Sequence, residues 1–267
     1  MIVTLAVLLL LLSFFLLLWW GQERVLFQPP RLNGLPLEPG QVDYETSDGQ
    51  RLIGYIVGNP DAARGVLLCF HGNADLAVWQ MEWAHSVTNR TGYSVFLAEY
   101  RGYMSLSGTP SYASTKLDAI AAYDHISSGL NSSAERIAYF GHSLGSAIAT
   151  ELAETHPPCA LLLQSPFTSA RAMATRIVPA PVTLAWKAIS RIHFDTEQAV
   201  KRLDVPVWVA HGKHDRIVPF GMGVQVYEAA KIKGEFLAVE TAGHNDVEAA
   251  GGEEYWNWIT RSLDTAG

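Results

Sequence analysis

The hydrophobic positions of the chain change their period along its length. After residue 64, short apolar runs of four to six residues recur between longer segments that carry one apolar stripe each. Continuous apolar runs of this length are typical of strands that are covered on both faces. We predict such strands at Gly65–Phe70, Ser94–Ala98, Ile137–Phe140, Ala160–Leu163, Val205–Ala210 and Glu235–Val239.

Segments with helical periodicity alternate with these strands. They lie at 74–88, 111–126, 144–152, 220–231 and 246–263. This alternation predicts right-handed crossovers and a mostly parallel sheet with helices on both faces. Ahead of it, Gln41–Thr46 and Arg51–Val57 alternate polar and apolar residues around Asp48-Gly49, which indicates a hairpin and brings the expected sheet to eight strands.

The first twenty residues contain no charged residue, no proline and no glycine. Their length suits a helix that spans a bilayer, and Trp19 and Trp20 suit a membrane interface. No Lys or Arg precedes the apolar run, and Leu-Leu-Trp-Trp is a poor cleavage site. We therefore expect a membrane anchor over residues 1–22, with a cleaved signal peptide as the alternative. Too few positive charges flank the segment to orient it.

A proline-rich linker is expected over residues 23–40, followed by one domain over residues 41–267. An insertion at about 166–203 separates two predicted strands and is rich in apolar residues. Such a short cap beside an anchored domain suits an acyl chain presented from a bilayer. The alternative is that these side chains only pack onto the sheet.

The charge and the cysteines narrow the class of partner. A formal net charge of −7 argues against nucleic acid, because phosphate binding requires a basic face. It also gives no attraction to anionic lipid, so membrane contact would be apolar. Cys69 and Cys159 lie in apolar runs and are expected to be buried free thiols. The sequence has no metal-type Cys/His spacing, and neither a metal nor a cofactor is expected.

The motif Gly141-His142-Ser143-Leu144-Gly145 follows one predicted strand and opens a predicted helix. A serine on such a sharp turn projects above the edge of the sheet, and the flanking glycines relieve crowding. The N-terminus of the helix behind it favours negative charge. We therefore predict that Ser143 is a catalytic nucleophile.

A serine nucleophile needs a base, and the base needs an orienting carboxylate. His244 follows the last predicted strand, where a loop can place an imidazole over the sheet edge. Asp215 follows the strand Val205–Ala210, which gives the chain order Ser-Asp-His. Asp246 is the competing carboxylate, but its position fits better as the N-cap of the last helix. The predicted triad is Ser143, His244 and Asp215.

Acyl transfer also needs hydrogen-bond donors for the developing oxyanion. One should be the backbone N–H of Leu144, directly after the nucleophile. The other should come from the loop after Gly65–Phe70, which reads His71-Gly72-Asn73-Ala74, and we choose the backbone N–H of Asn73.

Seven motifs together resemble one branch of the α/β-hydrolase superfamily, from about Gln41 to the end of the chain. They are His71-Gly72-Asn73-Ala74, Glu99-Tyr100-Arg101-Gly102-Tyr103, Ser107-Gly108-Thr109-Pro110-Ser111, Gly141-His142-Ser143-Leu144-Gly145, Ser165-Pro166-Phe167-Thr168-Ser169, His211-Gly212-Lys213-His214-Asp215 and Gly243-His244-Asn245-Asp246. The branch contains membrane-anchored serine hydrolases related to bud-emergence proteins and protein depalmitoylases. The resemblance implies an α/β-hydrolase fold with a short cap, and activities that include lipid and thioester hydrolysis. Met104 departs from the branch, which usually has a glycine there.

These features predict a serine hydrolase that cleaves carboxylic-ester or thioester bonds of acyl or lipid-like substrates through an acyl-enzyme. A peptidase of the same superfamily and a catalytically silent membrane scaffold are the alternatives. The expected partners are the acyl substrate and membrane lipid, contacted through the N-terminal helix. The expected location is a membrane, with a single N-terminal span. The side of the membrane and the oligomeric state are left open by the sequence.

Overall fold

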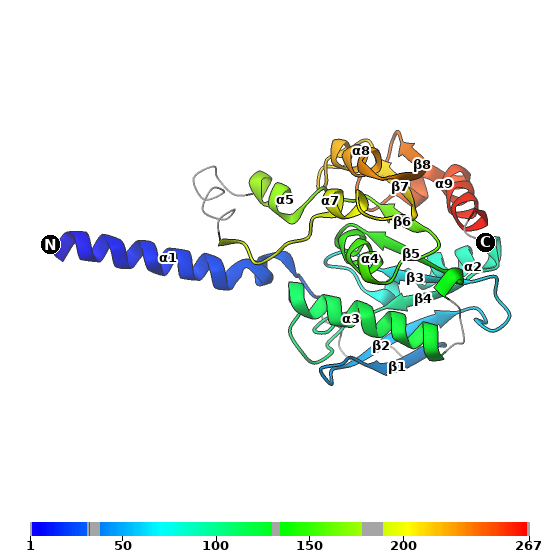
Figure 1. Cartoon of the computed structure of the whole chain (residues 1–267), viewed down its shortest axis with the longest axis horizontal. Coiled ribbons are helices and arrows are strands. Elements are labelled where there is room, and N and C mark those ends of the chain that lie inside the picture. Colours follow the sequence, from blue (N-terminus) through cyan, green and yellow to red (C-terminus); the bar gives the residue numbers. More distant parts are fainter. Residues whose placement is uncertain (1, 31, 33–37, 130–133, 178–188, 266–267) are drawn as a thin grey trace.

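The predicted apolar runs form one eight-stranded sheet in the computed structural model, which describes residues 2–30, 32, 38–129, 134–177 and 189–265 (Figure 1). The strand order is β1-β2-β4-β3-β5-β6-β7-β8. β2 pairs antiparallel with β1 and β4, and all other neighbours are parallel. The strands are β1 (Gln41–Glu45), β2 (Arg51–Val57), β3 (Val66–Phe70), β4 (Ser94–Ala98), β5 (Ile137–His142), β6 (Leu161–Gln164), β7 (Pro206–Gly212) and β8 (Ile232–Val239).

Helices cover both faces of this sheet, as predicted. One face carries α3 (Tyr112–Asp124), α4 (Leu144–Thr155) and α8 (Phe220–Ala229), and the other carries α2 (Met81–Thr91) and α9 (Val247–Asp264) (Figure 1). Every residue of the central strands β3 and β4 is therefore buried. Three short turns complete the body of the domain: η1 (Ala77–Gln80), η2 (His125–Gly129) and η3 (Ala134–Arg136).

The helix predicted from residue 74 begins later than expected. Ala74 has a left-handed backbone with φ 52°, and regular helix starts only with η1 and then α2. The carboxylates of Asp75 and Glu99 accept the N–H groups of Leu76 and Ala77, so these amides are satisfied without a preceding helical turn. The residues after β3 are consequently a loop, which carries Asn73 over the sheet edge.

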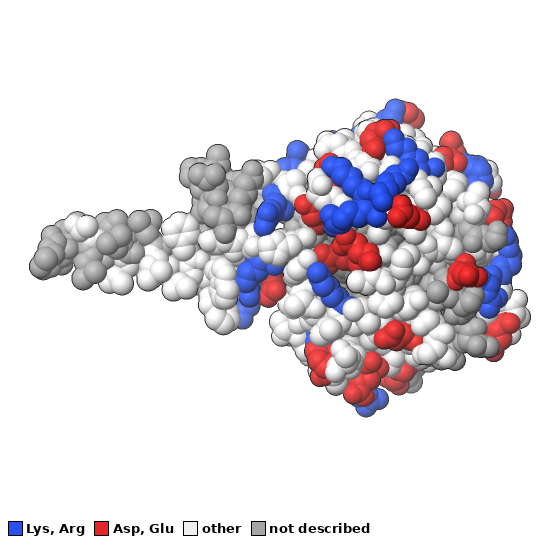
Figure 2. All heavy atoms as spheres, viewed as in Figure 1, with Lys and Arg blue, Asp and Glu red and all other residues white. Residues whose placement is uncertain are grey.

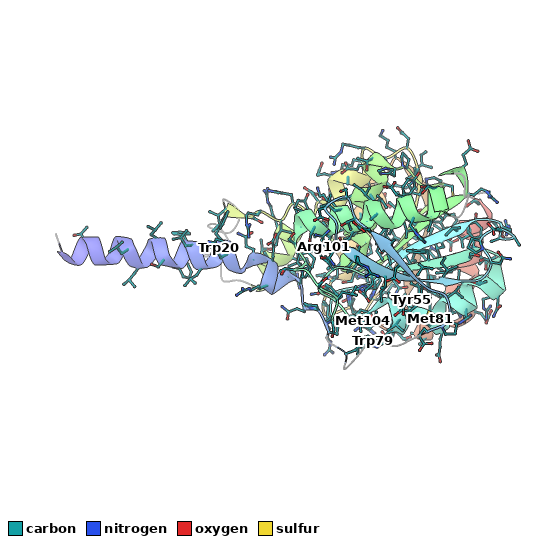
Figure 3. The ribbon with its side chains drawn as sticks, turned by 90° about the horizontal axis from the view of Figure 1, so that it is seen from below. Trp20, Tyr55, Trp79, Met81, Arg101 and Met104 are labelled. Atoms are coloured by element: carbon teal, nitrogen blue, oxygen red, sulfur yellow. The ribbon has the colours of Figure 1, made fainter. Side chains whose placement is uncertain are left out.

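The N-terminal apolar segment forms α1 (Ile2–Leu26), which projects away from the sheet (Figure 1). Its described side chains include exposed Leu10, Leu17 and Trp20, of which Trp20 is labelled in Figure 3. Charged side chains are spread over the surface of the domain that Figure 2 presents. Among the residues whose structure is described, no helix is long and apolar enough to cross a membrane. The membrane span stays a prediction.

The helix α1 extends four residues past the predicted boundary at residue 22. Its last turn includes Gln22, Val25 and Leu26, and the N–H of Phe27 donates to the carbonyl of Glu23 at 2.7 Å. The first proline of the chain is Pro29, so no proline interrupts the hydrogen bonds of the helix before that residue. The start of the predicted linker is therefore helical.

The predicted insertion at 166–203 contains α5 (Ala170–Ile177) and α7 (Thr196–Val200). Residues 178–188, which include Pro179, Pro181 and Trp186, lie outside the described part of the chain. Both cysteines are free, as predicted, but only Cys69 is fully buried. Cys159 is half-buried because it precedes β6 instead of lying inside it.

Met104 stands where the family resemblance implies glycine, and its backbone explains that preference. Its φ is +48°, in the left-handed region that costs a residue with a side chain about 1–2 kcal/mol. The side chain is fully buried near Tyr55, whose hydroxyl donates to the Met104 sulfur at 3.6 Å (Figure 3). The Met104 N–H donates to the carbonyl of Pro30 at 3.2 Å. Packing therefore offsets the backbone strain and also fastens this loop to the segment that follows α1.

Candidate active site

Ser143 lies on the sharp turn between β5 and α4. Its φ is +52°, which is rare for a residue with a side chain and is a form of strain found at functional sites. A Cβ atom at Gly141 would come within 2.4 Å of the Gly145 carbonyl oxygen, and one at Gly145 within 2.0 Å of the Phe70 carbonyl oxygen. Only glycine therefore fits on either side of the serine, as the motif predicts.

The structure brings the three predicted triad residues together from the ends of β5, β7 and β8. The His244 Nε2 atom lies 2.9 Å from the Ser143 hydroxyl oxygen, and its Nδ1 atom lies 2.6 Å from Asp215 Oδ2. Asp215 Oδ1 accepts the backbone N–H groups of Ile217 and Val218, each at 2.8 Å. An imidazole that donates from Nδ1 to Asp215 can accept the serine proton at Nε2.

The carboxyl group of Asp215 is held in its charged form. Burial alone would raise its pKa, but hydrogen bonds from His211 and His244 outweigh burial and hold the pKa well below the ordinary range. The His211 Nε2 atom lies 3.2 Å from Asp215 Oδ2. A permanently ionised Asp215 can stabilise the imidazolium that forms when His244 takes a proton.

Asp246, the competing carboxylate, does not contact the imidazole of His244. It occupies the N-cap position of α9, as predicted, but its Oδ1 accepts the N–H of Gly243 at 2.6 Å and caps no helical amide. The loop thus uses Asp246 to hold its own backbone and leaves the Nδ1 atom of His244 to Asp215.

The two amides predicted to bind the oxyanion belong to residues that line one cavity with Ser143. Leu144 is the first residue of α4, and Asn73 lies in the loop after β3. Neither backbone N–H donates a hydrogen bond to another group in the described ranges. Both are therefore available to a developing negative charge beside the serine.

A second imidazole, that of His142, packs against His244 with ring centroids 5.1 Å apart. Its Nε2 atom lies 3.3 Å from the His244 carbonyl oxygen. Burial, followed by the nearby charge of His244, lowers the pKa of His142 to about 4. His142 is therefore neutral near pH 7, so it adds no positive charge beside the triad.

Ser143 lies where two cavities of different character meet. The first has a volume of about 330 Å³ and is lined mainly by apolar side chains, including Val25, Leu26, Phe167, Met173, Ile192 and Val218. The second has a volume of about 590 Å³, and its polar lining includes Asp75, Gln80, Gln164, Asn245, Glu248 and Tyr255. Asn73, Ser143 and Ile217 line both. We call them the apolar cavity and the polar cavity.

Most of these lining residues carry no local signal in the sequence. Val25 and Leu26 belong to the N-terminal helix, and Gln164 to the end of β6. Tyr255, which also lines the polar cavity, donates a hydrogen bond to Gln164 Oε1 at 2.8 Å. The apolar residues of the predicted insertion were the one sequence feature that pointed to a cavity, and the structure places Phe167, Met173 and Ile192 among its lining residues.

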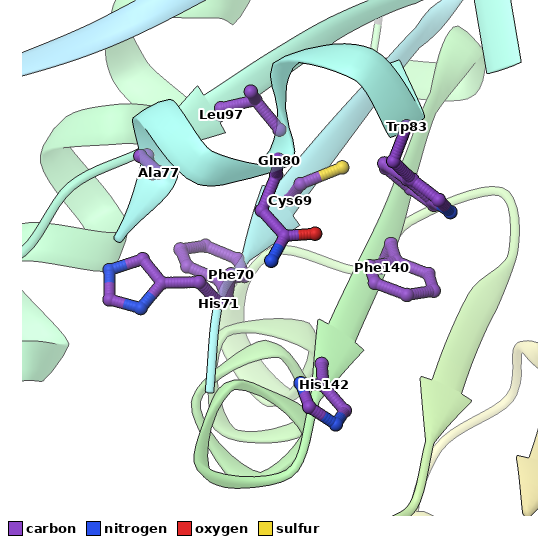
Figure 4. Close-up of a pocket in the computed structure, with 10 residues that line it drawn as sticks. Cys69, Phe70, His71, Ala77, Gln80, Trp83, Leu97, Phe140 and His142 are labelled. Atoms are coloured by element: carbon purple, nitrogen blue, oxygen red, sulfur yellow. The ribbon is translucent and has the colours of Figure 1, made fainter. Parts of the chain in front are cut away.

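A third, much smaller pocket adjoins the polar cavity, and Figure 4 shows the side chains that line it. Its volume of about 10 Å³ holds roughly one water molecule. Gln80, Trp83, Phe140 and His142 line both this pocket and the polar cavity. The pocket is too small for a substrate, so its side chains serve as packing behind His142. Within the described ranges, no cluster of three or more His, Cys, Asp or Glu residues could hold a metal ion.

Comparisons with known proteins agree with the fold and place the chain in a family. The family model described as serine aminopeptidase, S33, matches residues 61–195. An uncharacterized protein of Mycobacterium tuberculosis is 35% identical over 224 residues, covering 82% of this chain and 77% of its own. The α/β-hydrolase domain-containing protein WAV2 of Arabidopsis thaliana is 30% identical, covering 91% and 87%. The chain therefore belongs to the serine aminopeptidase S33 family of the α/β-hydrolase superfamily, and the predicted resemblance is confirmed.

Further matches support a hydrolase. The human α/β-hydrolase domain-containing protein 17B is 29% identical over 77% of this chain and 69% of its own. Among solved structures, the Pyrococcus furiosus esterase Pf2001 superposes with a TM-score of 0.67 at 18% identity, covering 89% of this chain and 97% of the esterase. A monoacylglycerol lipase of Paleococcus ferrophilus gives 0.61 at 20% identity, covering 81% and 99%. At these identities, the structural matches show a shared fold.

Proposed function

We propose that this protein is a serine hydrolase that cleaves carboxylic-ester or thioester bonds of acyl substrates through an acyl-enzyme. The observation that carries the proposal is the position of Ser143, between an apolar cavity and a polar cavity and within 2.9 Å of the His244 imidazole. The apolar cavity suits the acyl chain, because burying each methylene there is worth about 0.8 kcal/mol. The polar cavity suits an alcohol or thiol leaving group.

The geometry supports a two-step mechanism. The Ser143 oxygen attacks the acyl carbonyl while His244 Nε2 takes the hydroxyl proton, and Asp215 stabilises the imidazolium. The N–H groups of Leu144 and Asn73 bind the oxyanion. His244 then gives its proton to the departing alcohol or thiol, and the serine keeps the acyl group as an ester. A water activated by His244 attacks that ester and releases a carboxylic acid and free Ser143.

The names of two structural neighbours support ester substrates, because one is an esterase and the other is a monoacylglycerol lipase. The matching family model is described as a serine aminopeptidase, which supports a peptidase as the second candidate. The carboxylates of Asp75 and Glu248 in the polar cavity would suit the α-ammonium group of a peptide. A panel of acyl esters, acyl thioesters and aminoacyl anilides offered to the same preparation separates the two candidates.

The first test of the proposed mechanism is covalent labelling of the detergent-solubilised full chain with a fluorophosphonate probe. We expect the wild type to be labelled and Ser143→Ala to lose all labelling, because only an activated serine reacts with the probe. Far-UV circular dichroism of both proteins controls for folding. A well-folded wild type that is not labelled would contradict the mechanism and favour the catalytically silent scaffold.

We also propose that α1 anchors the protein in a membrane. The proposal is supported by the absence of charge in the first twenty residues and by exposed apolar side chains such as Leu10 and Leu17. The full chain should stay with the membrane pellet after alkaline carbonate extraction. Release into the supernatant would contradict an anchor, and a mature N-terminus that begins after Trp20 would establish the signal peptide instead.

A further inference from the structure

We infer that the last turn of α1 forms one wall of the acyl cavity, so that the N-terminal helix takes part in selecting the acyl chain. Gln22, Val25 and Leu26 line the apolar cavity together with Ser143. Their spacing of three and four residues places them on one face of the helix. The inference rests on the proposed function, because it assigns the apolar cavity to the acyl group.

The end of α1 is fastened to the insertion that forms the opposite wall. Gln22 is fully buried, its Nε2 donates to the Ile189 carbonyl at 3.1 Å, and its Oε1 accepts the Arg191 N–H at 2.8 Å. The guanidinium of Arg191 lies 3.5 Å from the Glu23 carboxylate and 4.1 Å from the centre of the Trp19 ring. A fully paired buried amide fixes the position of the helix, because unpairing it would leave two polar groups unsatisfied.

The same turn is fastened to the loop that carries the proposed oxyanion donor. The Asn73 side chain donates from Nδ2 to the Leu26 carbonyl at 2.5 Å, and its Oδ1 accepts the Gln28 N–H at 2.8 Å. Tyr103 donates its hydroxyl proton to the same oxygen at 2.9 Å. Asn73 therefore has both side-chain polar atoms committed to the end of α1 and to Tyr103, and its backbone N–H is left for the substrate.

These contacts make α1 part of the site and not only a tether. Val25 is 64% exposed, yet it faces the open side of the apolar cavity. The helix continues outward from this point with exposed apolar side chains, including Leu17 and Trp20 (Figure 3). An acyl chain that entered from the direction of α1 would pass exposed apolar side chains of the helix before it reached the mainly apolar lining beside Ser143.

The experiment enlarges Val25 and measures chain-length preference. Full-length Val25→Trp and wild type, both in detergent, are compared by the ratio of kcat/KM for p-nitrophenyl dodecanoate to that for p-nitrophenyl butanoate. We expect this ratio to fall at least about tenfold, because each methylene that loses its burial weakens binding by about fourfold. Leu17→Trp is the matched control, since it makes a similar change on the same helix at a position that is 73% exposed and outside the cavity lining. It should keep the wild-type ratio.

Three outcomes separate this inference from the proposed function. An unchanged ratio in Val25→Trp, with wild type active on both esters, would overturn the inference alone. An equal fall of the ratio in Val25→Trp and Leu17→Trp would also overturn it, because the effect would then not depend on whether the residue lines the cavity. Failure of the wild type to cleave any ester or thioester would overturn the proposed function. Val25→Ala gives a second measurement that does not depend on a bulky side chain: it removes apolar wall surface, so the ratio should fall, and an unchanged ratio in this variant would also overturn the inference.

Discussion

The apolar and polar cavities meet at the same serine but are built from different parts of the chain. The walls of the polar cavity come from the ends of β5 and β6, from η1 and from α9, which all belong to the body of the domain. The walls of the apolar cavity come largely from α1, α5 and the segment around Ile192, which lie outside the sheet and its covering helices. Under the proposed function, the sheet supplies the chemistry and the added segments supply the selection of the acyl chain.

The most severe way to break this comparison is to disable the carboxylate that orients His244 beside Ser143, the serine at which both cavities meet. Asp215→Asn should lower kcat by about a thousandfold to ten-thousandfold, the order known for the neutralised triad carboxylate of serine proteases, because an amide no longer favours the reactive tautomer of His244. Asp246→Asn is the matched control and should change kcat by less than about threefold, since its carboxylate bonds Gly243 and not the imidazole. Kinetics on p-nitrophenyl butanoate checks both. A larger loss of kcat in Asp246→Asn than in Asp215→Asn would show that the carboxylate of the triad is misassigned.

A second test replaces one apolar lining residue of the apolar cavity by a charged residue, and one charged lining residue of the polar cavity by an apolar residue. Met173→Glu places a carboxylate in the apolar cavity, where an unpaired charge is costly, and should lower kcat/KM for dodecanoate by about 10- to 100-fold relative to butanoate. The reciprocal change, Glu248→Met in the polar cavity, should leave this ratio within about threefold. Steady-state kinetics on the two esters gives the ratio. A similar fall of this ratio in both variants would mean that the acyl chain does not bind specifically in the apolar cavity.

A smaller effect concerns the neutral imidazole beside the polar cavity. The pKa of His142 is lowered to about 4, whereas an unfolded histidine titrates near 6.5. As pH falls from about 6.5 to about 4, the unfolded chain takes up a proton that the native protein does not, so native stability falls. When the pH is lowered from 7 to 5, the free energy of unfolding should fall in the wild type. The fall should be about 1–2 kcal/mol smaller in His142→Gln, because this variant lacks the imidazole. Urea unfolding at both pH values measures it, with exposed His85→Gln as the matched control. Equal losses in wild type and His142→Gln would show that burial does not oppose protonation of this ring.

The strands, and the meeting of Ser143, Asp215 and His244 at one edge of the sheet, were predictable because their signals are local. The apolar runs that predict β3 and β4 coincide with strands that are buried on every residue. The edge strand β8 begins at Ile232, three residues before the predicted start, because its first residues are exposed and show no apolar run. Ser143, Asp215 and His244 each follow a strand whose carboxyl end meets the same edge of the sheet, so the topology alone brings them close.

The cavities could not be predicted in this way, because their walls are assembled from distant segments. Val25 and Met173 are ordinary apolar residues in the sequence, and they line one and the same cavity only in the folded protein. The role of Asn73 was only half visible: its loop pointed to an oxyanion donor, but the hydrogen bonds of its side chain to Leu26 and Gln28 span more than forty residues.

The sequence by itself determined the order of strands and helices, the sharp turn at Ser143 and the candidate residues that follow the strand ends. These depend on period, on glycines beside one serine and on chain order, which are properties of neighbouring residues. Only the tertiary structure decided that the last turn of α1 lies against Ser143's apolar cavity and that Asp215, not Asp246, bonds the imidazole. The physical reason is that such contacts join side chains that lie far apart in the chain. Hydrophobic burial is non-directional, so an apolar residue in the sequence does not indicate which residue it will contact.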